Sequence, residues 1–412
     1  MKRLLLCGAA ALALVACGGE KKDATSTAGG ATVAATSEAA TPELGAWGVD
    51  TQDIDAATKP GDDFYRYVNG RWLDTFKIPD EYSSYGSFTV LLERSEERVK
   101  AIIEDAAKAN ASSGSNEKKI GDFFNAYFDT EAINSKALEP LAADFAAIDA
   151  LATHEDVARA LSDVRMAVTT PIGAFVDVDA KQPDRYIVYV TQAGLGMPNR
   201  DYYLDAKFAD KQAKYKSYVA QMLTLAGVVG GEAKATAIYD LERRMAEVHW
   251  APAKRRERDL TYNFKTLDDL RAFAPGAPWD AMLEGAGLTG QTMFVIREYD
   301  AIQNLVKILM ETPVEAWKDY MKFHLARGYA DVLPAAIDEA TFAFFGAELT
   351  GAVKQKERWK RGVAAVNGAM GEAVGNIYVE RHFPPESKAA MDTLVGNLRV
   401  ALDARLDTLP WM

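Results

Sequence analysis

The stretch Gln192–Leu204 has the sequence QAGLGMPNRDYYL, and it is among the most informative parts of this 412-residue chain. Its two glycines, Gly194 and Gly196, predict a turn that needs backbone freedom. The pair lacks the third glycine and the helix position of a dinucleotide-binding loop, which argues against nucleotide binding at this turn. Tyr202 and Tyr203 are interpreted as aromatic residues that pack and form hydrogen bonds.

A second informative stretch, Asp62–Leu73 (DDFYRYVNGRWL), predicts a short helix. Asp62 can cap this helix, because an aspartate side chain accepts a hydrogen bond from a free backbone N–H of the first turn. Four of the apolar and aromatic residues in this stretch are predicted to be core contacts: Phe64, Tyr65, Val68 and Trp72. Both stretches therefore have a structural explanation before any function is considered.

Most of the remaining chain is predicted to be helical. Apolar residues recur every three or four positions from Phe88 to Ala106, with Ser87 as the N-cap and Gly114 after the helix end. Further helices are predicted at 120–128, 138–151, 157–166, 208–226, 232–250 and from 267 to the end, with breaks at Pro278, Pro313, Pro334 and Pro384–Pro385.

One region has strand character instead. The runs Ile172–Val178 and Tyr186–Val190 are rich in β-branched and aromatic residues and flank a polar turn that contains Pro183, which predicts a β-hairpin. Three glycines near the end of the chain are expected to allow close helix approach: Gly368, Gly371 and Gly375. The expected fold class is mainly α, with one or more multi-helix lobes and a small β-hairpin.

The first residues predict export. Lys2 and Arg3 precede an apolar run of 12 residues, Leu4–Val15, which is too short for a membrane-spanning helix of roughly 20 residues. Such a run is typical of a secretory signal. It ends in Leu14–Cys17 (LVAC), which looks like a bacterial lipoprotein cleavage box. We expect cleavage before Cys17 and lipidation of its thiol, and the alternative is an ordinary signal peptide with an incidental cysteine.

The predicted organisation has three parts: a lipoprotein signal peptide at 1–16, a flexible tether at 17–44 and a folded body at 45–412. The tether is rich in Gly, Ala, Ser and Thr and cannot bury enough apolar surface to offset the entropy of ordering. The body exceeds the roughly 250–300 residues of a single core, so two lobes, or one lobe and part of another, are expected. The predicted location is the bacterial cell envelope, lipid-anchored, facing the periplasm or the exterior.

Charge and cysteine content narrow the possible partners. The formal net charge is −12, and it becomes −14 when residues 1–16 leave with Lys2 and Arg3. An acidic chain argues against nucleic acid as a partner, since phosphates are neutralised by clustered Lys and Arg, and against a polybasic membrane-binding face. The membrane is expected as a partner only through lipid on Cys17. Cys7 leaves with the signal, so no intramolecular disulfide is expected.

The two stretches, with four further blocks, resemble the N-terminal half of the neprilysin and endothelin-converting enzyme family of zinc metalloendopeptidases, in its bacterial lipoprotein branch. The further blocks are Ile78–Phe88, Arg258–Asn263, Arg358–Val379 and Leu409–Met412. The resemblance runs from about residue 48 to the last residue. It implies the N-terminal region of a two-lobed peptidase whose complete form uses zinc and acts on peptides.

The family's zinc site lies in the C-terminal half, outside this resemblance. It needs two histidines at i and i+4 on one helix, with a glutamate beside the first as general base. His154 and Glu155 begin this pattern, but Ala158 stands where the second histidine is required, and a methyl group cannot ligate a metal. The remaining histidines are isolated in sequence: His249, His324 and His382. No catalytic or metal-ligating residue is assigned, and no cofactor is expected in this chain.

Three polar features have a structural explanation first. Thr153 and the acids after it are interpreted as a capped helix start. Lys254–Arg258 is interpreted mainly as a solvated helix face or a strip of inter-lobe ion pairs, and alternatively as a contact for an anion or a peptide carboxylate. Ser84 stands where the resemblance places an arginine that binds the carboxylate end of short substrates in animal members. A hydroxyl cannot supply that bidentate contact, so no substrate-binding residue is assigned.

Two functional hypotheses result. In the first, the chain is the substrate-enclosing N-terminal region of a membrane-anchored zinc endopeptidase, interrupted by truncation, by a split gene or by an incomplete sequence, and inactive alone. In the second, it is a standalone surface lipoprotein that binds peptides or a partner protein without cutting them. The first is favoured, because the exposed surface expected where a catalytic half would dock invites aggregation if nothing covers it.

Overall fold

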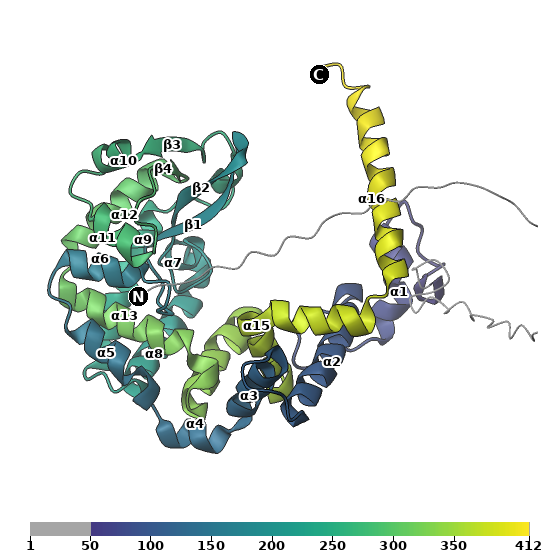
Figure 1. The fold of residues 1–412 in the computed structure, drawn as a ribbon, viewed down its shortest axis with the longest axis horizontal. Coiled ribbons are helices and arrows are strands. Elements are labelled where there is room, and N and C mark those ends of the chain that lie inside the picture. The colour runs from purple at the N-terminus through teal and green to yellow at the C-terminus, as the bar shows by residue number, and fades with distance from the viewer. Residues whose placement is uncertain (1–50, 412) are drawn as a thin grey trace, which may run out of the picture. The chain divides into compact units, whose positions relative to one another are not determined.

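The computed structural model describes residues 51–411. The predicted signal peptide, the tether and the lipidation site Cys17 lie outside the described residues. The chain divides after Lys77 into two units. The larger unit, which begins at Ile78, contains most of the helices and the four strands of the described chain (Figure 1).

The smaller unit contains a 3₁₀ turn, η1 (Thr51–Asp53), and one helix, α1 (Phe64–Thr75). The predicted helix is present, but Asp63 is its cap, since its side chain accepts from the N–H of Arg66 at 2.8 Å. Asp62 lies one residue too early for that contact. A Cβ at Gly70 would lie 2.3 Å from Cβ of Asp55, so only glycine fits at this crossing.

Two of the predicted core contacts of α1 are wrong. Phe64 and Tyr65 are 67% and 64% exposed, respectively, whereas Val68 and Trp72 are half-buried. Phe64 and Tyr65 occupy the first turn of α1. Residues 51–77 have only η1 as another element to pack against this helix, which leaves part of its apolar surface uncovered.

The smaller of two main cores is formed by the consecutive helices α2 (Ser87–Lys108) and α3 (Asn116–Phe128) together with the distant helix α15 (Arg358–His382). Close packing depends on two glycines. A Cβ at Gly121 would lie 2.7 Å from the carbonyl oxygen of Ala106, and one at Gly362 would lie 2.9 Å from the ring of Phe128. This cluster confirms the predicted α2 and α3 helices, and its buried residues are Val99, Ile102, Ile103, Ala106, Ile120, Phe124, Val363, Val366 and Val374.

Two local predictions in this cluster are wrong: the Ser87 cap and the close approach at three glycines. Gly86 is the N-cap of α2 and Ser87 is its first residue, without a side-chain capping bond. Phe88 is 90% exposed and does not belong to the core. A Cβ added at Gly368, Gly371 or Gly375 would meet no atom within 4 Å. These glycines therefore permit no close approach here, and the backbone of α15 is non-helical at the neighbouring Met370.

The larger core lies in the part of the chain between α4 and η6, and α16 (Pro385–Leu406) comes after α15 near the C-terminus. The helices between α3 and α15 are α4 (Thr130–Lys136), η2 (Glu139–Leu141), α5 (Ala142–Asp149), α6 (His154–Ser162), α7 (Asp201–Leu204), η3 (Ala206–Phe208), α8 (Ala209–Leu225), α9 (Gly231–Val248), η4 (Lys254–Arg256), α10 (Leu267–Phe273), α11 (Trp279–Gly285), α12 (Tyr299–Glu311), α13 (Val314–Gly328), η5 (Ala330–Val332), α14 (Ala335–Thr341) and the π-helix η6 (Phe342–Thr350). Pro278, Pro313 and Pro334 each precede a helix, as predicted.

The β-hairpin is present and belongs to a larger sheet than predicted. Strands β1 (Ile172–Asp179) and β2 (Gln182–Gln192) pair antiparallel, and Pro183 lies within β2 and not in the turn. Two short strands complete the order β1-β2-β4-β3: β3 (Asn263–Thr266) and β4 (Met293–Ile296). β4 runs parallel to β2 and antiparallel to β3. Four residues are too few to show a clear alternating pattern in sequence.

The sheet presents two different faces, because successive side chains point to opposite sides. Val188, Val190 and Phe294 face the larger core. Ile187, Tyr189 and Val295 form a small cluster on the opposite face, where Tyr262 packs against them. A pocket of the larger unit opens on this second face. Among residues 51–411, none of the helices combines the length and apolarity that a membrane span requires.

Candidate functional site

The histidine nearest to a zinc motif has a structural role. Thr153 and Asp156 form a reciprocal capping box at the start of α6, which confirms the predicted helix start. Nε2 of His154 lies 2.9 Å from the carbonyl oxygen of Thr312, at the end of α12. Ala158, one turn further along α6, is buried in the larger core. This position holds a methyl group in apolar packing and offers no second metal donor.

The other histidines do not converge. Nε2 of His249 is 3.0 Å from the carbonyl oxygen of Ala193, and burial lowers the pKa of this imidazole to about 4. His382 packs near the ring of Tyr378 in α15, with ring centroids 5.0 Å apart. Within the described part of the chain, no group of three or more His, Cys, Asp or Glu side chains could hold a metal ion. These residues do not fit a zinc site.

We call the part of the chain from α4 to η6, which contains the larger core, the larger lobe. His324 belongs to a buried polar network centred on Glu242, which α9 places inside this lobe. The Glu242 carboxylate accepts from the hydroxyl of Tyr203 at 2.6 Å and from that of Tyr215 at 3.1 Å, and Nε2 of His324 lies 2.9 Å from it. Burial lowers the pKa of His324 and raises the pKa of both tyrosines well above its usual value. Three donors around one carboxylate satisfy it, so Glu242 has a structural explanation as the centre of this network.

The network fixes the Gln192–Leu204 stretch. The Tyr203 hydroxyl also accepts from the N–H of Met197 at 2.8 Å, and Tyr320 donates to the carbonyl of Gly194 at 2.8 Å. Gly194 has φ +98°, and a Cβ at Gly196 would lie 1.8 Å from the Tyr215 hydroxyl. The predicted need for backbone freedom is confirmed at Gly194, whereas Gly196 is required by close approach. No nearby sequence pattern links Glu242 to this turn.

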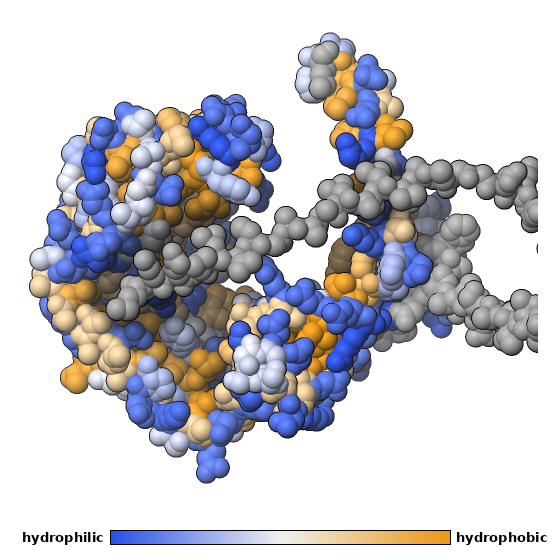
Figure 2. Space-filling view, in the orientation of Figure 1, coloured by the Kyte–Doolittle hydropathy of each residue, from blue (hydrophilic) through white to orange (hydrophobic). Residues whose placement is uncertain are grey.

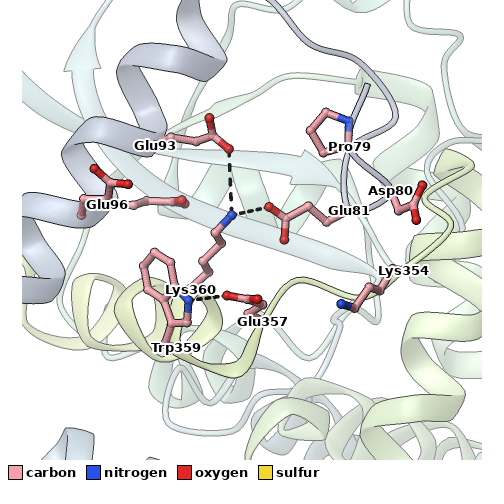
Figure 3. A pocket seen from close by; sticks show the side chains of 10 residues that line it. Pro79, Asp80, Glu81, Glu93, Glu96, Lys354, Glu357, Trp359 and Lys360 are labelled. Carbon is pink, nitrogen blue, oxygen red and sulfur yellow. Dashed lines mark hydrogen bonds and ion pairs between the residues drawn. The ribbon is translucent and has the colours of Figure 1, made fainter. Parts of the chain in front are cut away.

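An acidic pocket of about 430 Å³ lies between the segment that begins at Pro79, helix α2 and the start of α15 (Figure 3). Figure 3 shows Lys360 reaching toward Glu81 and Glu93, which it contacts as ion pairs. The backbone N–H groups of Val353 and Lys354 donate to the carbonyl of Asp80 at 2.9 and 3.0 Å. These contacts explain the pocket as a junction between the Pro79 segment, α2 and the distant start of α15, in which Glu81 and Glu93 are already paired with Lys360.

Ser84 lies in the same segment, is exposed, and does not line the acidic pocket. The neighbouring Tyr85 donates to Glu93 at 2.5 Å, and this hydrogen bond raises the pKa of Tyr85 to about 12. The segment is therefore anchored by Tyr85, while Ser84 presents a hydroxyl to solvent. Nothing in the described contacts gives Ser84 a binding partner or a charge.

A second pocket, of about 510 Å³, lies on the face of the sheet that carries Ile187, Tyr189 and Val295. We call it the arginine pocket. Its lining residues are Phe175, Asp177, Val178, Ala180, Tyr189, Arg255, Arg256, Arg258, Thr261, Tyr262 and Arg297. Four arginines and one aspartate make this lining strongly basic within an acidic chain. Lys254–Arg258 was interpreted mainly as a solvated helix face or a strip of inter-lobe ion pairs, and alternatively as a contact for an anion or a peptide carboxylate; three of these residues line a cavity.

The comparisons with known proteins agree on one family. The N-terminal sequence model of peptidase family M13 matches residues 60–412. Endothelin-converting enzyme-like 1 of Rattus norvegicus is 26% identical over 379 residues, which cover 87% of this chain and 48% of that protein. Endothelin-converting enzyme 1 of Homo sapiens is 25% identical over 381 residues, which cover 87% and 48%. The chain thus spans about half the length of these relatives.

Solved structures give the same result. The Mycobacterium tuberculosis zinc metalloprotease Zmp1, in complex with an inhibitor, superposes with a TM-score of 0.82 at 36% identity, over 88% of this chain and 56% of Zmp1. PepO from Lactobacillus rhamnosis superposes with a TM-score of 0.73 at 18% identity, over 86% of this chain and 57% of PepO. The likeness to PepO concerns the fold alone.

Proposed function

This chain belongs to peptidase family M13, and from that premise we propose that it forms the substrate-enclosing N-terminal region of a membrane-anchored zinc metalloendopeptidase. The family match extends over residues 60–412 and confirms the resemblance found in the sequence. In this proposal the catalytic zinc and its ligands are supplied by a part of the enzyme beyond the matched region. The chain alone then neither holds catalytic zinc nor hydrolyses peptides.

One observation above the others supports a zinc site that lies outside this chain. The four histidines of the described chain make separate structural contacts: His154 with Thr312 at the end of α12, His249 with Ala193, His324 with Glu242 and His382 with Tyr378. A zinc peptidase needs two helical histidines that reach one metal, with a neighbouring glutamate. The chain also covers about half of its relatives, so the missing chemistry has a place elsewhere in a complete enzyme.

An apolar helix face provides a docking surface for that other half. Helix α16 has no buried residue, and exposed apolar side chains recur along it at intervals of three and four: Met391, Leu394, Val395, Leu398 and Leu402. Figure 2 shows apolar residues along this helix. A continuous exposed apolar stripe marks an interaction site. We assign it to the remaining half of the family protein, because the relatives are about twice as long as this chain.

The proposal is tested with the purified 412-residue chain, measured alone for bound zinc and for hydrolysis of a quenched fluorescent peptide. We expect less than one equivalent of zinc, without saturable binding, and no hydrolysis above the buffer control. Stoichiometric zinc together with hydrolysis would refute the proposal. The DNA after codon 412 gives an independent check, since a frame that encodes a His-Glu-x-x-His helix would identify the partner half.

Membrane anchoring is the second part of the proposal, and it depends on Cys17. The sequence Leu14–Cys17 supports lipidation, and lipid chains on that cysteine would hold the chain at the envelope. The matched variant is Cys17→Ser, with Cys7→Ser as the control, because Cys7 would leave with the signal peptide. We expect Cys17→Ser to move the chain from the membrane fraction to the soluble fraction. Unchanged fractionation of Cys17→Ser would contradict lipid anchoring.

A second candidate function is a standalone surface lipoprotein that binds peptides or a partner protein without catalysis. The arginine pocket favours this candidate, because peptide binding there would require no metal. The two candidates differ in the DNA expected downstream of codon 412 and in the solution behaviour of α16. A chain that is monomeric and soluble at high concentration would support the standalone binder, whereas association through the α16 stripe would support an incomplete enzyme.

A further inference from the structure

We infer that the arginine pocket is a binding site for acidic peptide segments, with guanidinium groups for Asp or Glu side chains and aromatic rings for an adjacent apolar residue. The assignment of a peptide, as opposed to another carboxylate, rests on the proposed function. The pocket volume of about 510 Å³ lies within the roughly 300–1,000 Å³ of typical ligand sites.

The pocket is built by the fold from distant segments. The hairpin contributes Phe175 and Tyr189, whose rings stack with centroids 5.3 Å apart. Arg297 comes directly after β4, and its N–H continues the sheet by donating to the carbonyl of Val190 at 2.9 Å. Residue alternation then places Arg297 on the same face as Val295, and its guanidinium lies 5.9 Å from the Phe175 ring centre.

The basic cluster contributes one anchored arginine and two arginines without a carboxylate partner. Nε of Arg255 is 2.9 Å from Glu298, a fully buried carboxylate that also accepts from Thr191 at 2.8 Å. Arg256 and Arg258 are exposed and form no side-chain hydrogen bond or ion pair with residues 51–411. Their guanidinium groups are therefore available to a ligand.

The acid that lines the pocket does not cancel the positive charge of the lining. Asp177 is the single carboxylate of the lining. Asp179 lies beside it and is already occupied, because Tyr262 donates to it at 2.7 Å and Arg185 at 2.6 Å. Burial alone would raise the pKa of Asp179, but these hydrogen bonds lower it to about 2. With Arg255 counted against Glu298, the lining keeps three arginines against one aspartate.

The donor set favours carboxylates of a peptide over polyanions. Guanidinium groups match a carboxylate with two parallel hydrogen bonds, and the aromatic rings offer apolar area beside them. A net charge of −12 on the whole chain opposes binding of a long polyanion, whereas a short acidic segment can use the local positive lining. The hydroxyls of Tyr189 and Tyr262 are engaged with Val178 and Asp179, so recognition falls to the arginines.

The test is fluorescence anisotropy with the purified full chain and three labelled peptides. The probes are Gly-Glu-Phe-Glu-Gly, Gly-Gln-Phe-Gln-Gly and Gly-Lys-Phe-Lys-Gly, each with an amidated C-terminus. We expect the Glu peptide to bind about tenfold more tightly than the Gln peptide, which is the scale of one charge-assisted contact, and the Lys peptide to bind least. Equal affinity for the Glu and Gln peptides would overturn the inference.

The variant Arg256→Gln/Arg258→Gln should bind the Glu peptide about tenfold more weakly. Its matched control is Lys307→Gln/Arg399→Gln, which removes the same charge at exposed positions outside the pocket. The reversed variant Arg256→Glu/Arg258→Glu should prefer the Lys peptide. An unchanged affinity in both pocket variants, with native circular dichroism, would overturn the inference, and so would displacement of all three probes alike by inorganic phosphate, which would assign the pocket to free anions.

This experiment is independent of catalysis. Peptide binding by the chain needs neither zinc nor hydrolysis. A failed binding assay would therefore refute peptide binding at the arginine pocket and would leave the proposed enzymatic role unaffected. Zinc-dependent hydrolysis by the chain alone would refute the proposed function without affecting the measured preference for acidic peptides. The two failures are therefore distinguished by different measurements on the same protein.

Discussion

The larger lobe and the α2–α3–α15–α16 region bury their apolar residues very differently. In the larger lobe, a continuous core includes fully buried residues such as Trp317, Tyr320 and Phe323. In the other region, the core is small, and Phe88 of α2 and Leu398 of α16 are exposed. The difference indicates that the larger lobe can stabilise itself, whereas the second region presents apolar surface that suits a partner.

The largest expected effect is a loss of stability in the larger lobe, and it tests whether this lobe stabilises itself. Trp317→Ala should lower the free energy of unfolding by about 3–5 kcal/mol, because it empties a fully buried site and removes the indole bond to the carbonyl of Leu309 at 3.1 Å. Trp359→Ala is the matched control in the smaller core, where the tryptophan is only partly buried, and it should cost about 1–2 kcal/mol. Urea denaturation of both variants measures the difference. Equal losses of unfolding free energy would show that the two regions do not differ in how strongly their cores stabilise them.

Glycine substitutions sharpen the same comparison. Gly196→Ala should destabilise the chain by about 3 kcal/mol, because the new Cβ would lie 1.8 Å from the Tyr215 hydroxyl in a packed core. Gly375→Ala should instead stabilise α15 by about 0.5–1 kcal/mol, since the helix gains a better former in open space. Thermal unfolding of the two variants gives the signs directly. A neutral Gly196→Ala would show that the turn in the larger lobe can relax.

The buried imidazole of His249 predicts a pH dependence in the larger lobe. Burial lowers its pKa to about 4 in the folded state, against roughly 6.5 when unfolded. Below pH 6.5, His249 therefore binds a proton in the unfolded chain but not in the folded one. This difference lowers the free energy of unfolding by up to about 3 kcal/mol as the pH falls to 4. His249→Gln keeps a donor for Ala193 and should flatten this part of the profile. Urea titrations from pH 7 to 4 check it, and parallel profiles for the two proteins would exclude His249 as the source.

The smallest expected effect concerns α16. Leu394→Ser/Leu398→Ser should change the free energy of unfolding of the isolated chain by less than about 0.5 kcal/mol, because both side chains are already exposed. The same change should reduce self-association in sedimentation velocity. Asp392→Ser/Arg399→Ser is a polar control on the same helix. A loss of stability as large as that of Trp317→Ala would mean that the α16 face is packed and that its apolar side chains are covered in the isolated chain.

The sequence predicted many local features and missed those that depend on distant partners. The Thr153 cap, helix α9 and the hairpin arise from patterns within a few residues, and the structure confirms them. Strands β3 and β4 escaped detection, because each gains its identity from pairing across the sheet. Ser87 was misplaced by one residue, since a serine and a glycine at a helix start compete for the same cap position.

The candidate site shows the same limit. Arg256 and Arg258 were recognised as part of a basic cluster, with anion or carboxylate contact as an alternative. Phe175 and Arg297 carried no sequence signal for a pocket, because they lie 122 positions apart and meet only through the sheet. The sequence around Glu242 does not distinguish it from an exposed acid of an amphipathic helix. In the structure, Glu242 is fully buried and lies at the centre of a hydrogen-bond network.

The sequence by itself determined the family, the mainly helical class and the lack of a local His-Glu-x-x-His motif, because each of these depends on residues near one another along the chain. Only the tertiary structure decided that His324 meets Glu242, that four arginines share a pocket with two stacked rings, and that α16 carries an exposed apolar stripe. Burial, charge pairing and cavity shape arise from long-range contacts, and these are fixed only when the whole chain packs.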